Sequence, residues 1–145
     1  MSKKIDGGFA IVKTLKQLGI KDIFTLAGGH INPIYNACKE EGIRLIDFHH
    51  EQGASMAADA YGRVTKSPGV CLVTAGPGLT NVVTGMSGAF LSNSPCIFLS
   101  GKENPALVIK LSCSNLVGTS FPQVISLYCV NPAKLELGSL RLAIS

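Results

Sequence analysis

Short runs of apolar residues alternate along this chain with stretches whose apolar residues recur at helical spacing. The runs at 23–26, 43–48, 70–74 and 95–99 predict strands, because they are rich in β-branched or bulky side chains and end at turn-forming residues. Helical spacing predicts helices over 9–18, 32–38, 54–61 and 82–90. This alternation predicts right-handed crossovers and an α/β fold: a doubly wound, mostly parallel sheet with helices on both faces, in a single domain.

Turn and cap residues mark where these helices begin and end. Gly19 and Gly42 follow the first two helical stripes and predict their carboxyl ends. Asn32 followed by proline predicts the amino-terminal cap of the second helix, and Thr80 or Asn81 the cap of the fourth. The run at 70–74 is apolar throughout, which is typical of a strand covered on both faces.

Glu51 stands where the run at 43–48, predicted to be a buried strand, gives way to a helix. Ala54, Ala57, Ala58 and Tyr61 share one face of that helix, and because this face is almost wholly made of small side chains it predicts close packing against a neighbour. Glu51 therefore falls at the carboxyl edge of a parallel sheet, where open α/β folds hold ligands. A first-turn acid also complements the helix dipole, so its position by itself leaves a purely structural role open.

Composition narrows the class of protein. The chain has 145 residues, 46% hydrophobic and 15% charged, which predicts one globular domain. Its net charge of +4 comes from scattered lysines and arginines, so the sequence implies neither a nucleic-acid nor a membrane partner. A polar start and the lack of ~18 consecutive apolar residues predict a cytoplasmic, reducing location. Five cysteines without a Cys-x-x-Cys pair predict buried thiols.

The sequence departs from the common nucleotide-binding and metal-binding motifs at particular positions. The turn that begins at Gly76 starts like G-x-G-x-x-G, but its sixth place is Asn81 and no acidic ribose partner follows about 20 residues later. There is no phosphate-binding G-x-x-x-x-G-K-[ST] segment. His50-Glu51 lacks a second histidine four places on, so no metal ligand is predicted. These failures weaken the hypothesis of a nucleotide-binding α/β domain, which stays an alternative.

Several motifs in a fixed order together resemble one family. They are Ala27-Gly28-Gly29-His30-Ile31, His50-Glu51-Gln52-Gly53-Ala54, Tyr61-Gly62-Arg63, Gly69-Val70, Thr74-Ala75-Gly76-Pro77-Gly78-Leu79-Thr80-Asn81, Ser94-Pro95 and Ser100-Gly101. Between about Asp6 and Gly101 the chain resembles the amino-terminal pyrimidine-binding domain of thiamine-diphosphate enzymes. It is most similar to the acetolactate synthase, benzaldehyde lyase and 2-hydroxyacyl-CoA lyase branch, whose lyase-like members share a version of the segment at 27–31.

The resemblance implies a cofactor and a role for each matching residue. In the family, the carboxylate at the position of Glu51 bonds N1′ of the cofactor's aminopyrimidine, favouring the imino tautomer that takes the thiazolium proton. The resulting ylide attacks a carbonyl, and the thiazolium serves as electron sink while carbon dioxide leaves or a carbon–carbon bond breaks. Cofactor-binding positions implied here are Ala27, Gly28, Glu51, Thr74, Gly76, Pro77, Gly78 and Asn81, with His30 toward the substrate.

The resemblance also implies what this chain lacks. Family members hold Mg²⁺ and the diphosphate in a second α/β domain with a Gly-Asp-Gly motif, which is absent from these residues. The cofactor lies between subunits, so a dimer or a full-length relative would complete the site and the chain alone would be inactive. A 2-keto acid or a 2-hydroxyacyl compound would be the substrate. We expect a domain core over 1–103 and an atypical or truncated segment over 104–145; the alternative is a catalytically silent assembly module.

Overall fold

A computed structural model describes residues 7–101 and 126–130 of the chain, and it confirms the predicted alternation of strands and helices. The helices are α1 (Gly7–Gln17), the 3₁₀-helix η1 (Gly29–Ile31), α2 (Asn32–Glu41), α3 (Glu51–Thr65), α4 (Pro77–Asn81) and α5 (Val83–Leu91). The strands are β1 (Asp22–Thr25), β2 (Arg44–Asp47), β3 (Gly69–Val73), β4 (Cys96–Gly101) and β5 (Ser126–Val130).

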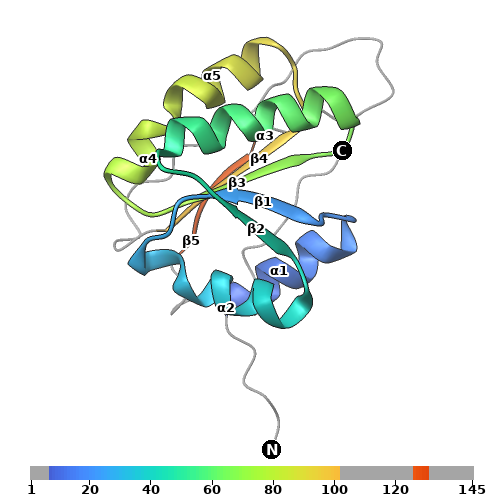
Figure 1. Cartoon of the computed structure of the whole chain (residues 1–145), viewed down its shortest axis with the longest axis vertical. Coiled ribbons are helices and arrows are strands. Elements are labelled where there is room, and N and C mark those ends of the chain that lie inside the picture. Colours follow the sequence, from blue (N-terminus) through green and yellow to red (C-terminus); the bar gives the residue numbers. More distant parts are fainter. Residues whose placement is uncertain (1–6, 102–125, 131–145) are drawn as a thin grey trace, which may run out of the picture.

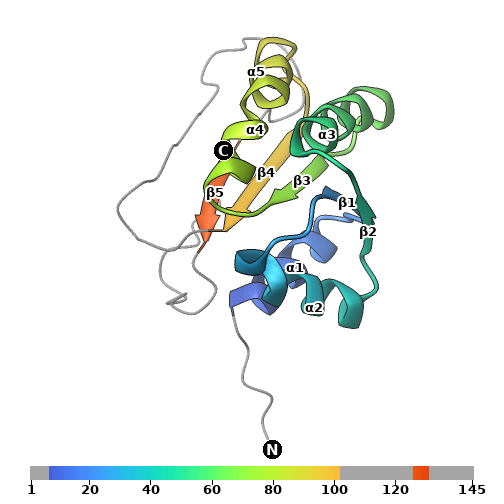
Figure 2. The ribbon, with the colours of Figure 1, turned by 60° about the vertical axis from the view of Figure 1, so that its left-hand side comes forward.

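The strands form one parallel sheet in the order β2-β1-β3-β4-β5, as expected for a doubly wound fold. Figure 1 shows α1 and α2 on one face of this sheet and α3, α4 and α5 on the other. The turned view in Figure 2 shows the same two helical layers with the strands between them. The predicted fold class is therefore confirmed.

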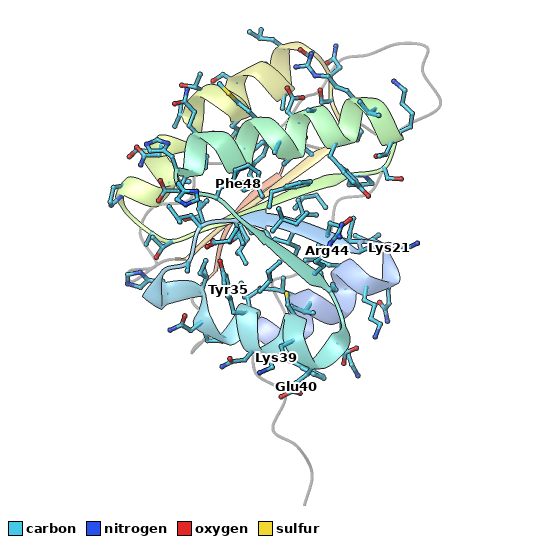
Figure 3. All side chains as sticks on the ribbon, viewed as in Figure 1. Lys21, Tyr35, Lys39, Glu40, Arg44 and Phe48 are labelled. Carbon is cyan, nitrogen blue, oxygen red and sulfur yellow. The ribbon has the colours of Figure 1, made fainter. Side chains whose placement is uncertain are left out.

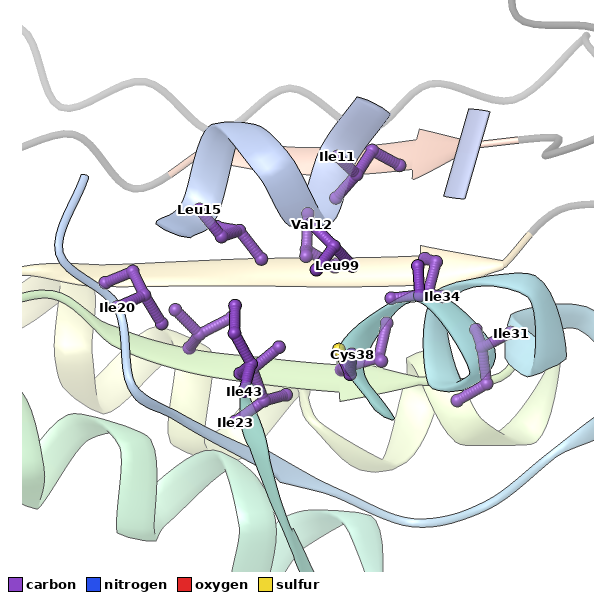
Figure 4. Packing of buried hydrophobic residues seen from close by; sticks show 13 residues of the cluster. Ile11, Val12, Leu15, Ile20, Ile23, Ile31, Ile34, Cys38, Ile43 and Leu99 are labelled. Carbon is purple, nitrogen blue, oxygen red and sulfur yellow. The ribbon is translucent and has the colours of Figure 1, made fainter. Parts of the chain in front are cut away.

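Each face of the sheet has its own apolar core. Side chains of α1 and α2 pack on one face with Ile23, Leu72 and Leu99, and Figure 4 shows part of this cluster. On the opposite face, α3 and α5 pack on Phe24, Cys71 and other residues of the same strands. Successive strand residues point to opposite faces, so each central strand contributes to both cores.

The positions of β3 and β2 explain why one strand prediction was right and another partly wrong. All five residues of β3 are buried, as its continuous apolar run predicted. By contrast, β2 pairs only with β1 among the described residues, and its four residues are half-buried or exposed. The strand predicted at 43–48 is therefore present, but the prediction that it is buried was wrong. Arg44 and Lys21 lie at the amino-terminal ends of β2 and β1 (Figure 3), where Arg44 donates to Asp22 over 2.7 Å.

Helix ends show where cap prediction succeeds and fails. Gly19 and Gly42 adopt positive φ values of 80° and 77°, as expected for residues that end helices. Leu18, predicted to continue the stripe of α1, lies beyond its end and is 42% exposed. Asn32 does not cap α2: η1 leads directly into that helix, and the Asn32 amide donates to the Gly29 carbonyl. Ile31 occupies the cap position without a side-chain bond.

The buried face of α3 is rotated from the one predicted. Ala54 and Ala58 are buried as expected, but Ala57 and Tyr61 are only half-buried, because Ser55, Asp59 and Gly62 turn toward α5 and β4 instead. A side chain at Gly85 of α5 would collide with Ser55, and one at Gly62 would collide with the Pro95 carbonyl. The predicted close approach to this helix is confirmed, with glycines on both partners.

Three further sequence expectations concern residues inside and outside the described part. Cys38, Cys71 and Cys96 are buried free thiols, and burial raises the pKa of Cys38 to about 11. None of the helices within residues 7–101 is long and apolar enough to cross a membrane. The predicted boundary at residue 103 and most of the segment 104–145 lie outside the described residues, although β5 falls within that segment.

One ion pair in α3 predicts a pH dependence of stability. Burial acts to raise the pKa of Asp59, but the hydrogen bond and the charge of the Arg63 guanidinium, together with Ser94, outweigh it, so the folded-state pKa is lowered. Protonation therefore favours the unfolded chain, and the pair's stabilisation, present above the ordinary Asp pKa of about 3.9, is lost as pH falls through the lower folded value. Because Arg63 is half exposed, we expect the ion pair to stabilise the folded domain by only about 0.5–1 kcal/mol.

Urea unfolding of wild type and Asp59→Asn measures this contribution. The two proteins should differ by that amount near neutral pH, and the difference should be smaller at roughly pH 3, where the pH has fallen below the ordinary Asp pKa toward the lower folded value. Asp47→Asn removes a charge from an exposed position at the end of β2 and serves as the control. An Asp59→Asn difference that is the same at both pH values would contradict the prediction.

Candidate functional site

The sheet has a topological switch point between β1 and β3. The chain leaves β1 toward η1 and α2 on one face, whereas it leaves the adjacent β3 toward α4 and α5 on the other. Two neighbouring strands whose following loops diverge leave a crevice at their carboxyl ends, where open α/β sheets bind ligands. Glu51 enters the same edge from β2, so three loops converge there.

Thr25, at the last position of β1, holds the two strands together beneath this crevice. Its hydroxyl donates to the Leu72 carbonyl over 2.6 Å and accepts from the Tyr35 hydroxyl at 2.7 Å. Burial raises the pKa of Tyr35, which keeps that hydroxyl protonated as the donor. Because β1 and β3 share only two register pairs, Phe24 with Cys71 and Thr25 with Leu72, these bonds supplement a short ladder.

Glu51 is the first residue of α3, and with Asp59 it is one of two buried carboxylates within residues 7–101. The preceding His50 caps the helix, its Nδ1 accepting from the Gln52 amide at 3.2 Å. Glu51 is only 9% exposed, and its Oε2 accepts a hydrogen bond of 2.9 Å from Asn81 Nδ2. A carboxylate here is favoured both by the amide and by the amino-terminal end of the helix dipole.

Asn81 donates a hydrogen bond to Glu51 and does not cap the following helix as predicted. Neither Thr80 nor Asn81 caps the helix that follows, because α4 already occupies residues 77–81 and α5 begins at Val83 without a side-chain cap. Thr80 Oγ1 donates to the Pro77 carbonyl at 3.1 Å, within α4. The short helix α4 therefore carries Asn81 to Glu51, linking the loop after β3 to the start of α3.

Two glycines of the turn after β3 are needed for different physical reasons. Gly76 has φ 68° and ψ −123°, a conformation that L side chains rarely adopt, and it caps α4. Gly78 is buried, and a Cβ there would lie 2.9 Å from Thr74 Cγ2 and 3.4 Å from Glu51 Oε1. Any larger residue at 78 would thus fill the space beside the second oxygen of this carboxylate.

Thr74, just beyond β3, contacts both the segment after β1 and the carboxyl end of β4. Its Oγ1 lies 3.1 Å from His30 Nδ1 in η1, and its carbonyl accepts from Ser100 Oγ of β4 at 3.1 Å. On its other side it packs against Gly28, where a Cβ would lie 2.7 Å from Thr74 Oγ1. His30 packs similarly against Gly101, where a Cβ would lie 2.5 Å from His30 Cβ.

Most of the residues predicted from sequence therefore form one connected group. Glu51 bonds Asn81 and lies beside Gly78, and Thr74 connects Gly78 to Gly28 and His30. Ala27 and Pro77 lie on the same two loops at exposed positions, as does Gly76. His50, Ser100 and Gly101 stand in the motifs of the resemblance, but sequence reasoning predicted neither the cap formed by His50 nor the support given by Ser100 and Gly101. The last two ended a predicted strand, and only the parallel register, which aligns Val73 with Ser100, brings them beside Thr74.

Comparison with known proteins decides the family. Residues 5–111 match the model of the thiamine pyrophosphate enzyme N-terminal TPP binding domain. The chain belongs to this family. The match includes every candidate site residue, and it confirms the resemblance inferred over residues 6–101.

Two groups of relatives within the thiamine pyrophosphate enzymes resemble the chain. It is 47% identical over 106 residues to the acetolactate synthase large subunit IlvG of Mycobacterium tuberculosis, covering 73% of this chain and 19% of that protein. It is 37% identical over 141 residues to 2-hydroxyacyl-CoA lyase 2 of Mus musculus, covering 96% of this chain and 22% of the relative. The chain thus spans about a fifth of the length of these relatives.

Proposed function

We propose that this chain is the pyrimidine-binding half of a thiamine-diphosphate site, with Glu51 as its proton-handling group. The observation that carries the proposal is the buried Glu51 carboxylate, held through Oε2 by Asn81 at the carboxyl edge of the sheet. Because a buried carboxylate is costly unless it is hydrogen-bonded, a protein has reason to keep one where its charge is used.

The residues present fit the aminopyrimidine part of the cofactor. One oxygen of Glu51 is occupied by Asn81, and the space beside the other is kept open by the missing side chain of Gly78. A second glycine, Gly28, lets backbone approach Thr74 on the opposite side of the switch point. Such glycine-lined backbone suits a flat heteroaromatic ring, which needs close approach on its face.

Each residue has a distinct task in this proposal. Thiamine diphosphate, when bound, supplies a nucleophilic thiazolium carbon and an electron sink for breaking or making a carbon–carbon bond beside a carbonyl. Glu51 would hold a proton at N1′ of the aminopyrimidine, and Asn81 would fix the rotamer of Glu51. Ala27, Gly28, Thr74, Gly76, Pro77 and Gly78 would line the ring, with His30 on the substrate side.

The remaining parts of the site would come from a partner. Among the described residues, no three His, Cys, Asp or Glu side chains gather to hold a metal ion. We therefore propose that a diphosphate-binding domain, in a second copy of a longer relative or in a full-length homologue, brings Mg²⁺ and completes a dimeric site. The relatives named above suggest a 2-keto acid or a 2-hydroxyacyl thioester as substrate.

Mixing experiments test this proposal. The chain is titrated with thiamine diphosphate and Mg²⁺ in a calorimeter, alone and together with a separately produced diphosphate-binding domain of an acetolactate synthase. We expect tight binding and pyruvate decarboxylation or carboligation only in the mixture. A mixture that forms a complex but neither binds cofactor nor turns over substrate would contradict the enzymatic role and support a silent assembly module instead.

A further inference from the structure

A close contact between α3 and α5 lies one helical turn beyond the bond from Asn81 to Glu51. A Cβ at Gly85 would lie 2.1 Å from Ser55 Oγ and 2.7 Å from Ser55 Cβ, so the two helices meet there without room for a side chain. Ser55 follows Glu51 by four positions, and Gly85 follows Asn81 by four. The two contacts therefore share one register, about 6 Å apart along helices that run in the same direction.

Ser55 cannot make way for a side chain at position 85. It is fully buried, and its hydroxyl donates to the Gln52 carbonyl over 2.8 Å, in the first turn of α3. The helix backbone fixes Ser55 Cβ, and a Cβ at Gly85 would lie about 0.7 Å inside ordinary contact with it. The Met56 amide nitrogen would also lie 3.0 Å from the new Cβ. A side chain at position 85 would therefore push α5 away from α3.

Such a displacement of α5 would reach Asn81 through a short, ordered connection. Val82 joins α4 to α5 with helical backbone angles, φ −85° and ψ −9°, and is fully buried. Its carbonyl accepts from the Met86 amide at 2.9 Å, so α4 and the first turn of α5 are expected to move together. A shift of about 0.7 Å would stretch the 2.9 Å bond from Asn81 to Glu51 beyond hydrogen-bond range.

We propose that Gly85 is a positioning residue, whose missing side chain lets α5 approach α3 closely enough for Asn81 to hold Glu51. A glycine lowers the helix propensity of α5, so its place there needs a packing reason, and the contact with Ser55 supplies one. The inference rests on the proposed function for its catalytic meaning, in which Asn81 fixes the rotamer of the Glu51 carboxylate. Gly85 acts through Asn81 and need not meet the cofactor.

Amide NMR of the whole chain, without cofactor, tests whether Gly85 controls this bond. Asn81→Ala identifies the side-chain amide signals of Asn81, and Glu51→Ala gives their position when the acceptor is missing. In Gly85→Ala we expect the signals to move at least half of the way toward that position. Gly88→Ala makes the same change in the same helix, where a Cβ would meet nothing within 4 Å, and should leave the signals in place. Unmoved signals in Gly85→Ala would overturn the proposal.

Removing the obstacle separates positioning from a general loss of packing. Ser55→Gly in the Gly85→Ala background deletes both Ser55 atoms that the alanine would meet, so the Asn81 signals should return most of the way to wild type. Within the Ser55→Gly background, the displacement should grow again from Gly85→Ala to Gly85→Val, because valine refills the space. This series decides the proposal even if Gly85→Ala alone does not fold. Signals that stay displaced after Ser55→Gly would contradict it.

The reconstituted mixture gives a second readout. Gly85→Ala should lower kcat on the order of tenfold, the loss of about one hydrogen bond, with the KM of the substrate little changed. In an Asn81→Ala background the same substitution should lower kcat no further, because Gly85 acts through Asn81. An equal further loss in that background would overturn the proposal. If the wild-type mixture has no activity, the proposed function fails while the NMR result still decides the role of Gly85.

Discussion

Glu51→Gln is expected to lower the activity of the reconstituted enzyme by about 10²–10⁴-fold while the fold stays intact. Glutamine has the size of glutamate and can still accept from Asn81, so the bond to α4 need not break. What is lost is the charge that would hold a proton at N1′. The expected loss is in kcat, because the proton relay acts in the chemical step.

Two measurements make this expectation specific. Urea unfolding should show Glu51→Gln to be about as stable as wild type, since the side chain keeps its volume and hydrogen bond. Glu40→Gln, at an exposed position of α2 in the opposite helical layer (Figure 3), makes the same chemical change away from the site and should leave kcat unaltered. Full activity of Glu51→Gln would remove the central residue of the proposed site.

Gly69→Ala is expected to destabilise the domain by about 3 kcal/mol, the upper part of the range for overpacking. Gly69 opens the central strand β3 and is buried, with its amide donating to the Pro95 carbonyl at 2.9 Å. A Cβ at this position would run into the carbonyl of Ala58 in α3. That obstacle is backbone of a helix, which cannot rotate aside as a side chain does, so α3 would have to shift.

Gly88→Ala provides the matched control. Gly88 lies within α5, where a Cβ would meet nothing within 4 Å, so alanine should stabilise the domain by about 0.5–1 kcal/mol through higher helix propensity. Urea denaturation curves of the three proteins give both differences. Equal stability of Gly69→Ala and wild type would show that α3 is not held against β3 as closely as described.

Structural features that are encoded by long or repeated sequence patterns could be predicted from the sequence. The order of strands and helices follows from repeated periodicity, and the five buried residues of β3 follow from an unbroken apolar run. The carboxylate at the start of α3 was also predictable, since a strand-to-helix turn can be recognised locally. The family resemblance added the glycine turn, which the structure brings to the same edge as Glu51.

Features that depend on residues distant in the sequence were not predictable. Asn81 has the local signature of a helix cap, and only the tertiary placement of α4 gives its amide to Glu51. Likewise, the apolar run at 43–48 resembles a buried strand, but strand order places it at an edge. The contribution of Ser100 to Thr74 depends on the register between β3 and β4, which no local pattern encodes.

The edge position of β2 bears on where the Glu51 carboxylate lies. A slip of one residue in β2 would draw Glu51 about 3.3 Å along the sheet and away from Asn81. Two anchors oppose such a slip: Arg44 to Asp22 at one end, and the Phe48 amide to the Thr25 carbonyl at 2.9 Å at the other. Arg44, an exposed residue at the opposite end of β2, thereby helps to set where the Glu51 carboxylate lies.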